Sequence, residues 1–161
     1  RPQLKFGVMF NQRTHPLYKR MREILQTGML GTLQRVTWII TNWFRSDAYY
    51  RSSGWRATWK GEGGGLLVNQ CPHNFDLLEW MLGMSPARVT ARVGLGKYHP
   101  IEVEDEFTAM LEYAPVRAGA PGLVGHLMAT TGEYPGTNRL EIAGSRGKLV
   151  AEDGTLHWLR T

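Results

Sequence analysis

Residues 63–83 read Gly-Gly-Gly-Leu-Leu-Val-Asn-Gln-Cys-Pro-His-Asn-Phe-Asp-Leu-Leu-Glu-Trp-Met-Leu-Gly, and the rest of the chain is organised around this stretch. Three glycines lead into an apolar run of helix length. Gly83 closes the run, as glycine commonly does just after the last residue of a helix. A proline inside a helix removes one N–H and clashes with the carbonyl four residues earlier. Pro72 therefore predicts either a kink near Asn69 or a helix that begins near Cys71.

The same run carries polar side chains at helical spacing. Asn69, His73, Asp76 and Trp80 follow one another at intervals of four, three and four residues, which places them on one face of a continuous helix. A buried helix must satisfy such side chains or present them to a cleft. Two interpretations stay open: hydrogen-bonded core residues, or a substrate-facing helix on which His73 is a general acid or base. The glycines would let the backbone approach a ligand or a neighbouring strand.

This stretch resembles the Gly-Gly-Gly-x-Leu-x-Asp-x-Gly-x-His-x-x-Asp signature of the glucose–fructose oxidoreductase, inositol dehydrogenase and rhizopine-catabolism family (Gfo/Idh/MocA). Further matches to the family follow in order along nearly the whole chain, and this ordered set is more specific than any one motif. They are Phe10–Pro16, Gly28–Gly31, Gly54–Arg56, Val103–Phe107, Pro135–Ile142 and the pair Gly144 and Gly147.

The resemblance implies a two-domain oxidoreductase, with a Rossmann domain for NAD or NADP followed by an α/β domain that shapes the substrate site. This chain resembles the second part alone, because it contains neither Gly-x-Gly-x-x-Gly nor the Lys-Pro motif whose lysine helps catalysis in the family. We expect residues 1–30 to be a remnant of the last Rossmann strand plus a linking helix. Residues 31–161 would form an incomplete C-terminal substrate and oligomerisation domain, with no cofactor bound to the fragment itself.

The resemblance also implies roles for single residues. The family's Asp-x-x-x-His pair maps onto Asn69 and His73. A carboxamide can orient a substrate hydroxyl but cannot take its proton, which leaves His73 as the base. Asp76 would belong to the substrate site, where it would fix the His73 tautomer or pack structurally. Asn11 and Arg13 would lie near the cofactor or substrate, although Arg13 fits a surface position equally well.

The periodicity predicts an α+β fold, a mostly antiparallel open sheet with helices packed on one face. The resemblance implies that this domain is of the dihydrodipicolinate-reductase-like C-terminal type. An apolar stripe predicts a helix over residues 15–27. Strands are expected at 4–10, 32–45, 87–95, 106–114, 122–131, 137–143, 147–151 and 155–159. Residues 32–45 carry apolar side chains on both faces, so the uncovered face is expected to pair with another copy in a homo-oligomer.

Residues 46–62 read as a loop that mixes aromatic rings with arginines. Tyr50, Arg51 and Trp55 are candidates to line a sugar or polyol pocket, and the alternative is that they anchor the loop to the body of the domain. The acidic residues Glu102 and Glu104–Glu106 are interpreted as a charged loop ahead of a strand rather than a metal site. His126 is interpreted as a packed residue, and the histidine spacing does not favour zinc.

Composition limits the class of protein. The chain has 161 residues, of which 42% are hydrophobic and 20% charged, as is ordinary for a globular domain with its own core. No apolar run is long enough to cross a membrane, and a single cysteine suits the reducing cytoplasm. The net charge is +5, but the basic residues are spread along the chain, which argues against nucleic-acid binding.

These observations lead to one functional hypothesis and one alternative. The first is the C-terminal domain of a nicotinamide-dependent oxidoreductase that acts on a sugar- or polyol-like substrate and is inactive as this fragment. The alternative is a non-catalytic sugar-binding or oligomerisation module, which the absence of an ionisable group at Asn69 favours.

Overall fold

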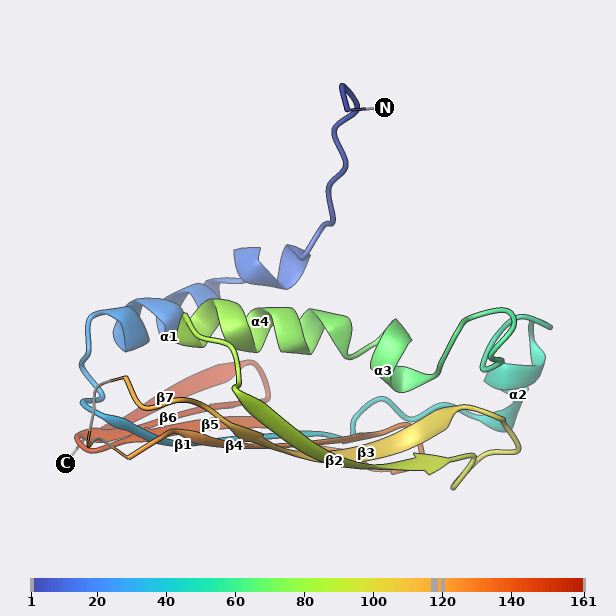
Figure 1. The fold of residues 1–161 in the computed structure, drawn as a ribbon. Coiled ribbons are helices and arrows are strands. Elements are labelled where there is room, and N and C mark those ends of the chain that lie inside the picture. The colour runs from blue at the N-terminus through green and yellow to red at the C-terminus, as the bar shows by residue number, and fades with distance from the viewer. Residues whose placement is uncertain (1, 117–118, 120, 161) are drawn as a thin grey trace.

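A computed structural model describes residues 2–116, 119 and 121–160, and it confirms the α+β, mostly antiparallel fold (Figure 1). One sheet runs in the order β2-β3-β4-β1-β5-β6-β7, and β1 and β4 are its parallel neighbours. The strands are β1 Leu33–Ile40, β2 Arg88–Leu95, β3 Glu104–Glu112, β4 Val124–Thr130, β5 Asn138–Gly144, β6 Gly147–Glu152 and β7 Thr155–Arg160.

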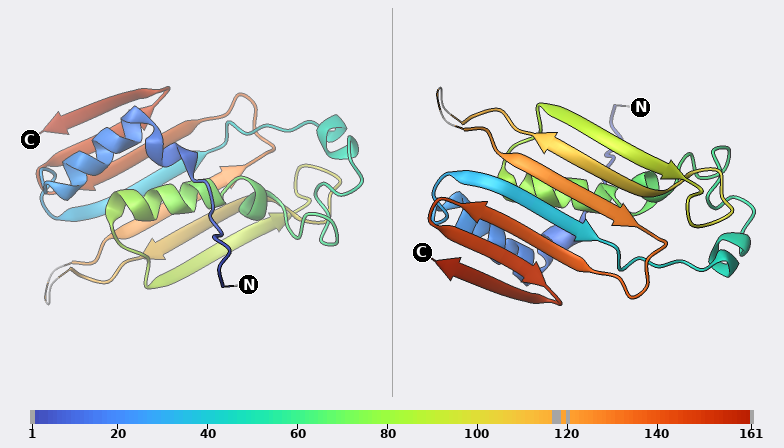
Figure 2. Two further views of the ribbon diagram at one scale, coloured as in Figure 1. Left: turned by 90° about the horizontal axis from the view of Figure 1, so that it is seen from above. Right: turned by 90° about the horizontal axis from the view of Figure 1, so that it is seen from below.

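The helices gather on one face of the sheet. Figure 2 shows α1 and α4 across that face in one view and the uncovered strands in the other. The helical elements are η1 Asn11–Thr14, α1 Pro16–Gln26, α2 Asp47–Arg51, α3 Leu66–Asn69 and α4 Pro72–Leu82. Alternate residues of the strands face the helices, so Trp38 and Ile142 of the sheet join Met21 of α1 and Leu77 of α4 in one buried core.

The predicted first helix is confirmed, and its ends have local causes. Pro16 stands at the first helical position, where its missing N–H costs nothing. The His15 Nδ1 accepts a hydrogen bond of 3.3 Å from the Leu17 N–H. The chain leaves the helix through Gly28, whose φ of +67° suits glycine.

The break inside residues 63–83 falls where Pro72 predicts it. Helix α3 ends at Asn69, and α4 starts at Pro72 and stops at the left-handed Gly83. At the front of the stretch, a Cβ added to Gly65 would lie 2.0 Å from the Glu104 carbonyl oxygen. The glycine run therefore brings the start of α3 against β3, which is the neighbouring-strand alternative.

Three of the predicted segments differ from the structure. Residues 4–10 form no strand and are mostly exposed, because a strand requires a partner for its backbone hydrogen bonds. The strand predicted over 32–45 ends at Ile40, after which the Thr41 N–H turns to the Thr137 carbonyl at 2.7 Å. The predicted loop 46–62 contains helix α2, whose first turn is capped by the Ser46 hydroxyl.

The uncovered face of the sheet is partly charged and partly apolar. Glu141 of β5 pairs with Arg35 at 2.7 Å and with Arg139 at 2.7 Å. On the neighbouring strands, Met110 is 38% exposed and Met128 is 39% exposed. His126 is also exposed here, so its interpretation as a packed residue was wrong; Leu127 and Ala129 of β4 point to the helices instead. Across the described ranges, we find no helix long and apolar enough to span a bilayer.

Candidate functional site

The junction between η1 and α4 is held by a forked ion pair. The Arg13 Nε donates to the Asp76 Oδ2 at 2.8 Å, and Nη2 of the same guanidinium donates to Oδ1. The Asp76 side chain is 10% exposed and that of Arg13 is 43% exposed. This hydrogen bonding raises the pKa of Arg13. Two residues that the sequence assigned separately, one to the cofactor and one to the substrate, thus contact each other.

His73 lies on the first turn of α4, beside this pair. Its ring meets the Phe10 ring edge to face, with centroids 5.9 Å apart and planes at 85°. Its Nδ1 is buried and has no hydrogen-bond partner within the described part of the chain. Both carboxylate oxygens of Asp76 bind Arg13 rather than His73. His73 as a whole is half-buried, and its other ring nitrogen, Nε2, is not among the buried atoms without a partner.

Asn69 occupies a different environment from His73. It ends α3, and its exposed carboxamide is engaged at both ends: Nδ2 donates to Glu62, and Oδ1 accepts from Gln70 Nε2 at 2.8 Å. The break before Pro72 interrupts the helical register between Asn69 and His73. The single polar face expected from their spacing is therefore divided between two helices.

Tyr50 lies on the Asn69 side of this division. Both residues line one small cavity under the loop, together with Glu62 and Glu104. The Tyr50 hydroxyl is 2.9 Å from the Thr131 hydroxyl, and its ring lies 4.9 Å from the His99 ring. Burial raises the pKa of Tyr50, which keeps the phenol protonated as a hydrogen-bonding group.

The other two loop candidates are more exposed. Arg51 is paired with Asp47 one helical turn away, at 3.9 Å. Trp55 is 49% exposed, and its ring lies 4.6 Å from the guanidinium of Arg56. The Arg56 guanidinium also lies 4.7 Å from the ring of Tyr49 and donates to its hydroxyl at 2.8 Å. Sequence reasoning missed Arg56, which ties the two aromatic rings together.

Glu104 and Asp105 are the first residues of β3 and not part of a loop ahead of it, so that part of the interpretation was wrong. Glu104 is 5% exposed, and its Oε1 accepts from the N–H groups of Gly65 at 2.9 Å and Leu67 at 3.0 Å. Asp105 is fully buried and accepts from the backbone N–H groups of residues 97–99 at 2.8–3.0 Å. Backbone donors satisfy these carboxylates.

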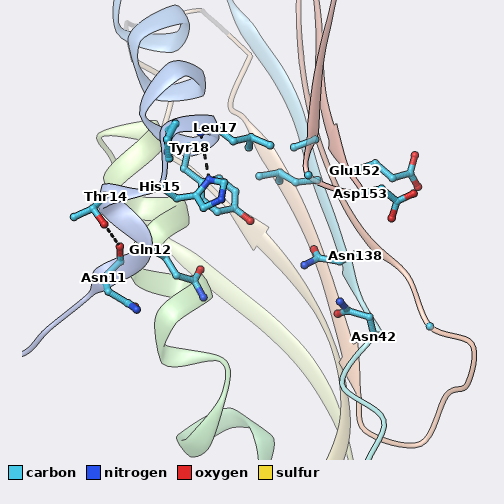
Figure 3. Close-up of a pocket in the computed structure, with 15 residues that line it drawn as sticks. Asn11, Gln12, Thr14, His15, Leu17, Tyr18, Asn42, Asn138, Glu152 and Asp153 are labelled. Atoms are coloured by element: carbon cyan, nitrogen blue, oxygen red, sulfur yellow. Dashed lines mark hydrogen bonds between the residues drawn. The ribbon is translucent and has the colours of Figure 1, made fainter.

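A larger cleft of about 700 Å³ opens on the other side of η1. Figure 3 shows Gln12, His15 and Tyr18 facing Asn42 and Asn138 across it. Asn11 was a candidate from the sequence, whereas these other residues were not. Asn11, Gln12 and Asn138 lie in stretches that carry the family resemblance, so a signal was present for them; Asn42 had none.

The sheet side of the cleft is fixed by a close backbone contact. A Cβ on Gly136 would lie 2.1 Å from the Thr41 carbonyl oxygen, and the Thr137 N–H donates to the Thr41 hydroxyl at 2.7 Å. The segment after β1 and the segment before β5 are therefore held together. This contact places Asn42 and Asn138 side by side on one wall (Figure 3).

The architecture and the placement of this polar cluster define the class. An open sheet of seven strands with helices on one face is the fold of the C-terminal domains of Gfo/Idh/MocA dehydrogenases. The model of the GFO/IDH/MocA C-terminal domain matches residues 18–150, and the chain belongs to this family.

Two curated relatives are oxidoreductases by name. The chain is 35% identical over 98 residues to a putative oxidoreductase, YteT, of Bacillus subtilis (strain 168), which covers 60% of this chain and 22% of the relative. It is 25% identical over 152 residues to inositol 2-dehydrogenase of Rhizobium meliloti (strain 1021), which covers 92% of this chain and 42% of the relative. The matched chain spans less than half the length of either protein.

Solved structures show the same fold. The WlbA dehydrogenase of Bordetella pertussis, in complex with NADH and UDP-GlcNAcA, superposes with a TM-score of 0.81 at 26% identity, over 96% of this chain and 47% of that one. Levoglucosan dehydrogenase, in complex with NADH and levoglucosan, gives a TM-score of 0.72 at 22% identity, over 96% and 46% of the two chains. The second likeness supports the fold alone.

Proposed function

We propose that this chain is the substrate-side domain of a nicotinamide-dependent oxidoreductase that acts on a sugar- or polyol-like alcohol. The observation that carries the proposal is the η1–α4 junction, where Arg13 and Asp76 hold the segment of Phe10 against the ring of His73. The WlbA dehydrogenase of Bordetella pertussis, which has the same fold, was solved with NADH and UDP-GlcNAcA. NAD or NADP would be bound chiefly by a separate dinucleotide-binding domain, so the chain alone would be inactive.

The residues fit such a cofactor at one point. Asn11 is exposed and the Arg13 side chain is 43% exposed, next to His73, so both can contact the nicotinamide end of a dinucleotide. When bound, the cofactor supplies the acceptor or donor of hydride. The chain's own task is to orient the alcohol and to manage its proton.

In this proposal His73 is the general base, or the relay to it. An imidazole near neutral pH can take the proton of a hydroxyl as the carbon loses hydride. The buried Nδ1 leaves Nε2 for the substrate. Asp76 contributes through Arg13, by fixing the position of η1 relative to α4. Asn69 and Tyr50, which line one cavity, form the outer wall together with Arg51 and Trp55.

Replacement of His73 tests the role in a version of the protein that carries its dinucleotide-binding domain. We expect His73→Ala and His73→Gln to lower turnover by about 10²–10⁴-fold, the usual contribution of a general acid or base. The affinity for the nicotinamide should stay unchanged. His157→Ala, at an exposed position of the edge strand β7, is the matched control. Wild-type turnover in His73→Ala would refute the acid–base role.

One observation favours the non-catalytic alternative. Asn69 cannot ionise, and Glu62 and Gln70 engage its carboxamide at both ends. Asn69→Asp separates the two candidates, because it adds an ionisable group beside Glu62. An enzyme would change its turnover or its pH profile, whereas a binding module would keep its sugar affinity and gain no activity.

The uncovered sheet face supports a further part of the proposal, that the protein is a homo-oligomer. Ile39 of β1 and the partly exposed Met110 and Met128 lie on this face, and symmetric pairing of such faces is common in oligomers. Met128→Lys should shift the sedimentation coefficient toward that of a monomer. An unchanged coefficient at micromolar concentration would contradict pairing through this face.

A further inference from the structure

The cleft beside η1 is a built polar site that the His73 chemistry does not use. We propose that it binds an uncharged sugar ring, as a second subsite for a substrate that carries one. The inference deepens the proposed function and rests on it, because it takes the bound sugar to be part of the substrate. The binding itself does not depend on any reaction. The polar residues that line the cleft are Asn11, Gln12, Thr14, His15, Tyr18, Asn42, Asn138, Glu152 and Asp153.

The walls of the cleft present oriented donors and acceptors. Trp38 Nε1 donates to the Asn138 Oδ1 at 3.0 Å, so the carboxamide is fixed with its NH₂ group left for a ligand. The His15 Nδ1 accepts from the Leu17 N–H, so its Nε2 is the donor that remains. Carboxamides both donate and accept, as sugar hydroxyls do. Leu140 and Ala151 give an apolar floor for the C–H side of a ring.

The cleft offers an anion no charge partner. None of the described residues that line it is lysine or arginine. The Glu152 carboxylate points away from η1 and pairs with Arg139, and Asp153 stands on the exposed β6–β7 turn (Figure 3). A diphosphate or a uronate would therefore lose its hydration here without gaining a cation. Nor do the described side chains contain a group of three potential ligands that could hold a metal ion.

The position of η1 connects this cleft with the candidate catalytic residue. Phe10 and Arg13 contact α4, at His73 and Asp76, whereas Gln12 lines the cleft. The short helix η1 therefore lies between His73 on one side and the cleft on the other. A substrate whose reacting alcohol lies at His73 can extend a second ring past Gln12, between α1 and the sheet.

Binding can be measured on this chain by NMR titration with cellobiose, an uncharged disaccharide, using the side-chain NH₂ signals of Gln12, Asn42 and Asn138 as reporters. We expect saturable shifts of these signals, and a loss of affinity of at least fivefold in Asn42→Ala. Gln34→Ala, which removes an exposed carboxamide on β1, should leave the affinity unchanged. UDP-glucuronate should not compete.

A charge variant sharpens the test. Asp153→Asn keeps a residue that tolerates the observed φ of +49° and removes one carboxylate. It should increase UDP-glucuronate binding at least threefold and leave cellobiose binding unchanged. The inference is overturned if cellobiose shifts none of the three reporters up to 50 mM (about the range of weak sugar binding), or if wild type binds UDP-glucuronate more tightly than cellobiose. Wild-type turnover in His73→Ala together with cellobiose binding would refute the acid–base role alone, whereas loss of turnover in His73→Ala with no cellobiose binding by the wild type would refute the subsite alone.

Discussion

Pro72 divides the polar residues of the central stretch between α3 and α4. A buried or half-buried carboxylate lies on each side of this division, but its hydrogen-bond donors differ. On the α3 side, Glu104 and Asp105 are buried and accept from backbone N–H groups. On the α4 side, Asp76 binds the partly exposed side chain of Arg13. The sheet repeats the second arrangement on its uncovered face, where Glu141 binds two arginines.

The difference separates stability from positioning. A buried N–H that loses its acceptor costs about 1–3 kcal/mol, so the α3 side is expected to be sensitive to any change at its carboxylates. A partly exposed ion pair contributes about 0–1 kcal/mol, so loss of the Arg13–Asp76 pair should barely affect folding. Its effect should appear in the geometry around His73.

The largest effect is expected from Gly65→Ala. The new Cβ would lie 2.0 Å from the Glu104 carbonyl oxygen, and backbone cannot move away as a flexible side chain can. We expect a loss of about 3 kcal/mol or more in the free energy of unfolding, measured by urea denaturation. Gly54→Ala is the control, because nothing lies within 4 Å of its added Cβ. Equal effects in the two variants would show that α3 does not depend on this approach.

Next comes Glu104→Ala, which leaves the N–H groups of Gly65 and Leu67 without their acceptor in a buried setting. The free energy of unfolding should fall by about 2–3 kcal/mol. Glu104→Gln keeps an acceptor oxygen and should lose less than half as much. If both variants lose the same amount, the charge of Glu104 matters more than its hydrogen bonds.

Local signals were enough to predict most of the elements. The stripe of Leu17, Met21, Ile24 and Leu25 gave the first helix, and Pro72 gave the break before α4. The strand predicted at 4–10 does not form, and no local pattern could have shown this. Whether an apolar segment becomes a strand depends on a partner, and its own side chains do not reveal one.

The candidate site was less predictable, because its contacts join distant parts of the chain. The spacing of Asn69 and His73 is correct for one helix face, but the break at Pro72 cancels that register. Arg13 and Asp76 are 63 residues apart, and Thr41 and Thr137 are 96 apart. The first pairing follows from the packing of η1 on α4 and the second from the pairing of β1 with β5, and the sequence gives neither. For this reason Asn42 and Asn138 were not recognised as neighbours.

Glu141, the carboxylate that two arginines bind, gives a prediction about the pH dependence of stability. Hydrogen bonds from Arg35 and Arg139 lower the pKa of Glu141 from 4.5 to about 2. A pKa that is depressed in the folded state gives stability that is present above about pH 4.5 and lost as the pH falls toward 2. Wild type should therefore exceed Glu141→Gln by about 1 kcal/mol at pH 6, because the arginines that bind Glu141 are partly exposed and solvent screens their charge. Denaturant titrations should show this difference disappear by about pH 2; a constant difference would contradict the ion-pair origin.

The smallest effect on folding is expected from Arg13→Lys. Lysine keeps the positive charge but cannot make the two parallel N–H contacts that Arg13 gives to Asp76. The free energy of unfolding should change by less than about 1 kcal/mol. Arg20→Lys is the matched control, because Arg20 also pairs with a carboxylate, that of Glu23 at 3.0 Å, on the exposed face of α1.

Activity should distinguish the two lysine variants where stability does not. If the fork fixes η1 and thereby the Phe10 ring against His73, turnover of the protein with its dinucleotide-binding domain should fall about tenfold in Arg13→Lys, because misplacement of a catalytic group by a fraction of an ångström costs rate. Arg20→Lys should retain wild-type turnover. Equal turnover in the two variants would make the Arg13–Asp76 pair an ordinary surface contact, and the α4 side would then differ from the α3 side in stability alone.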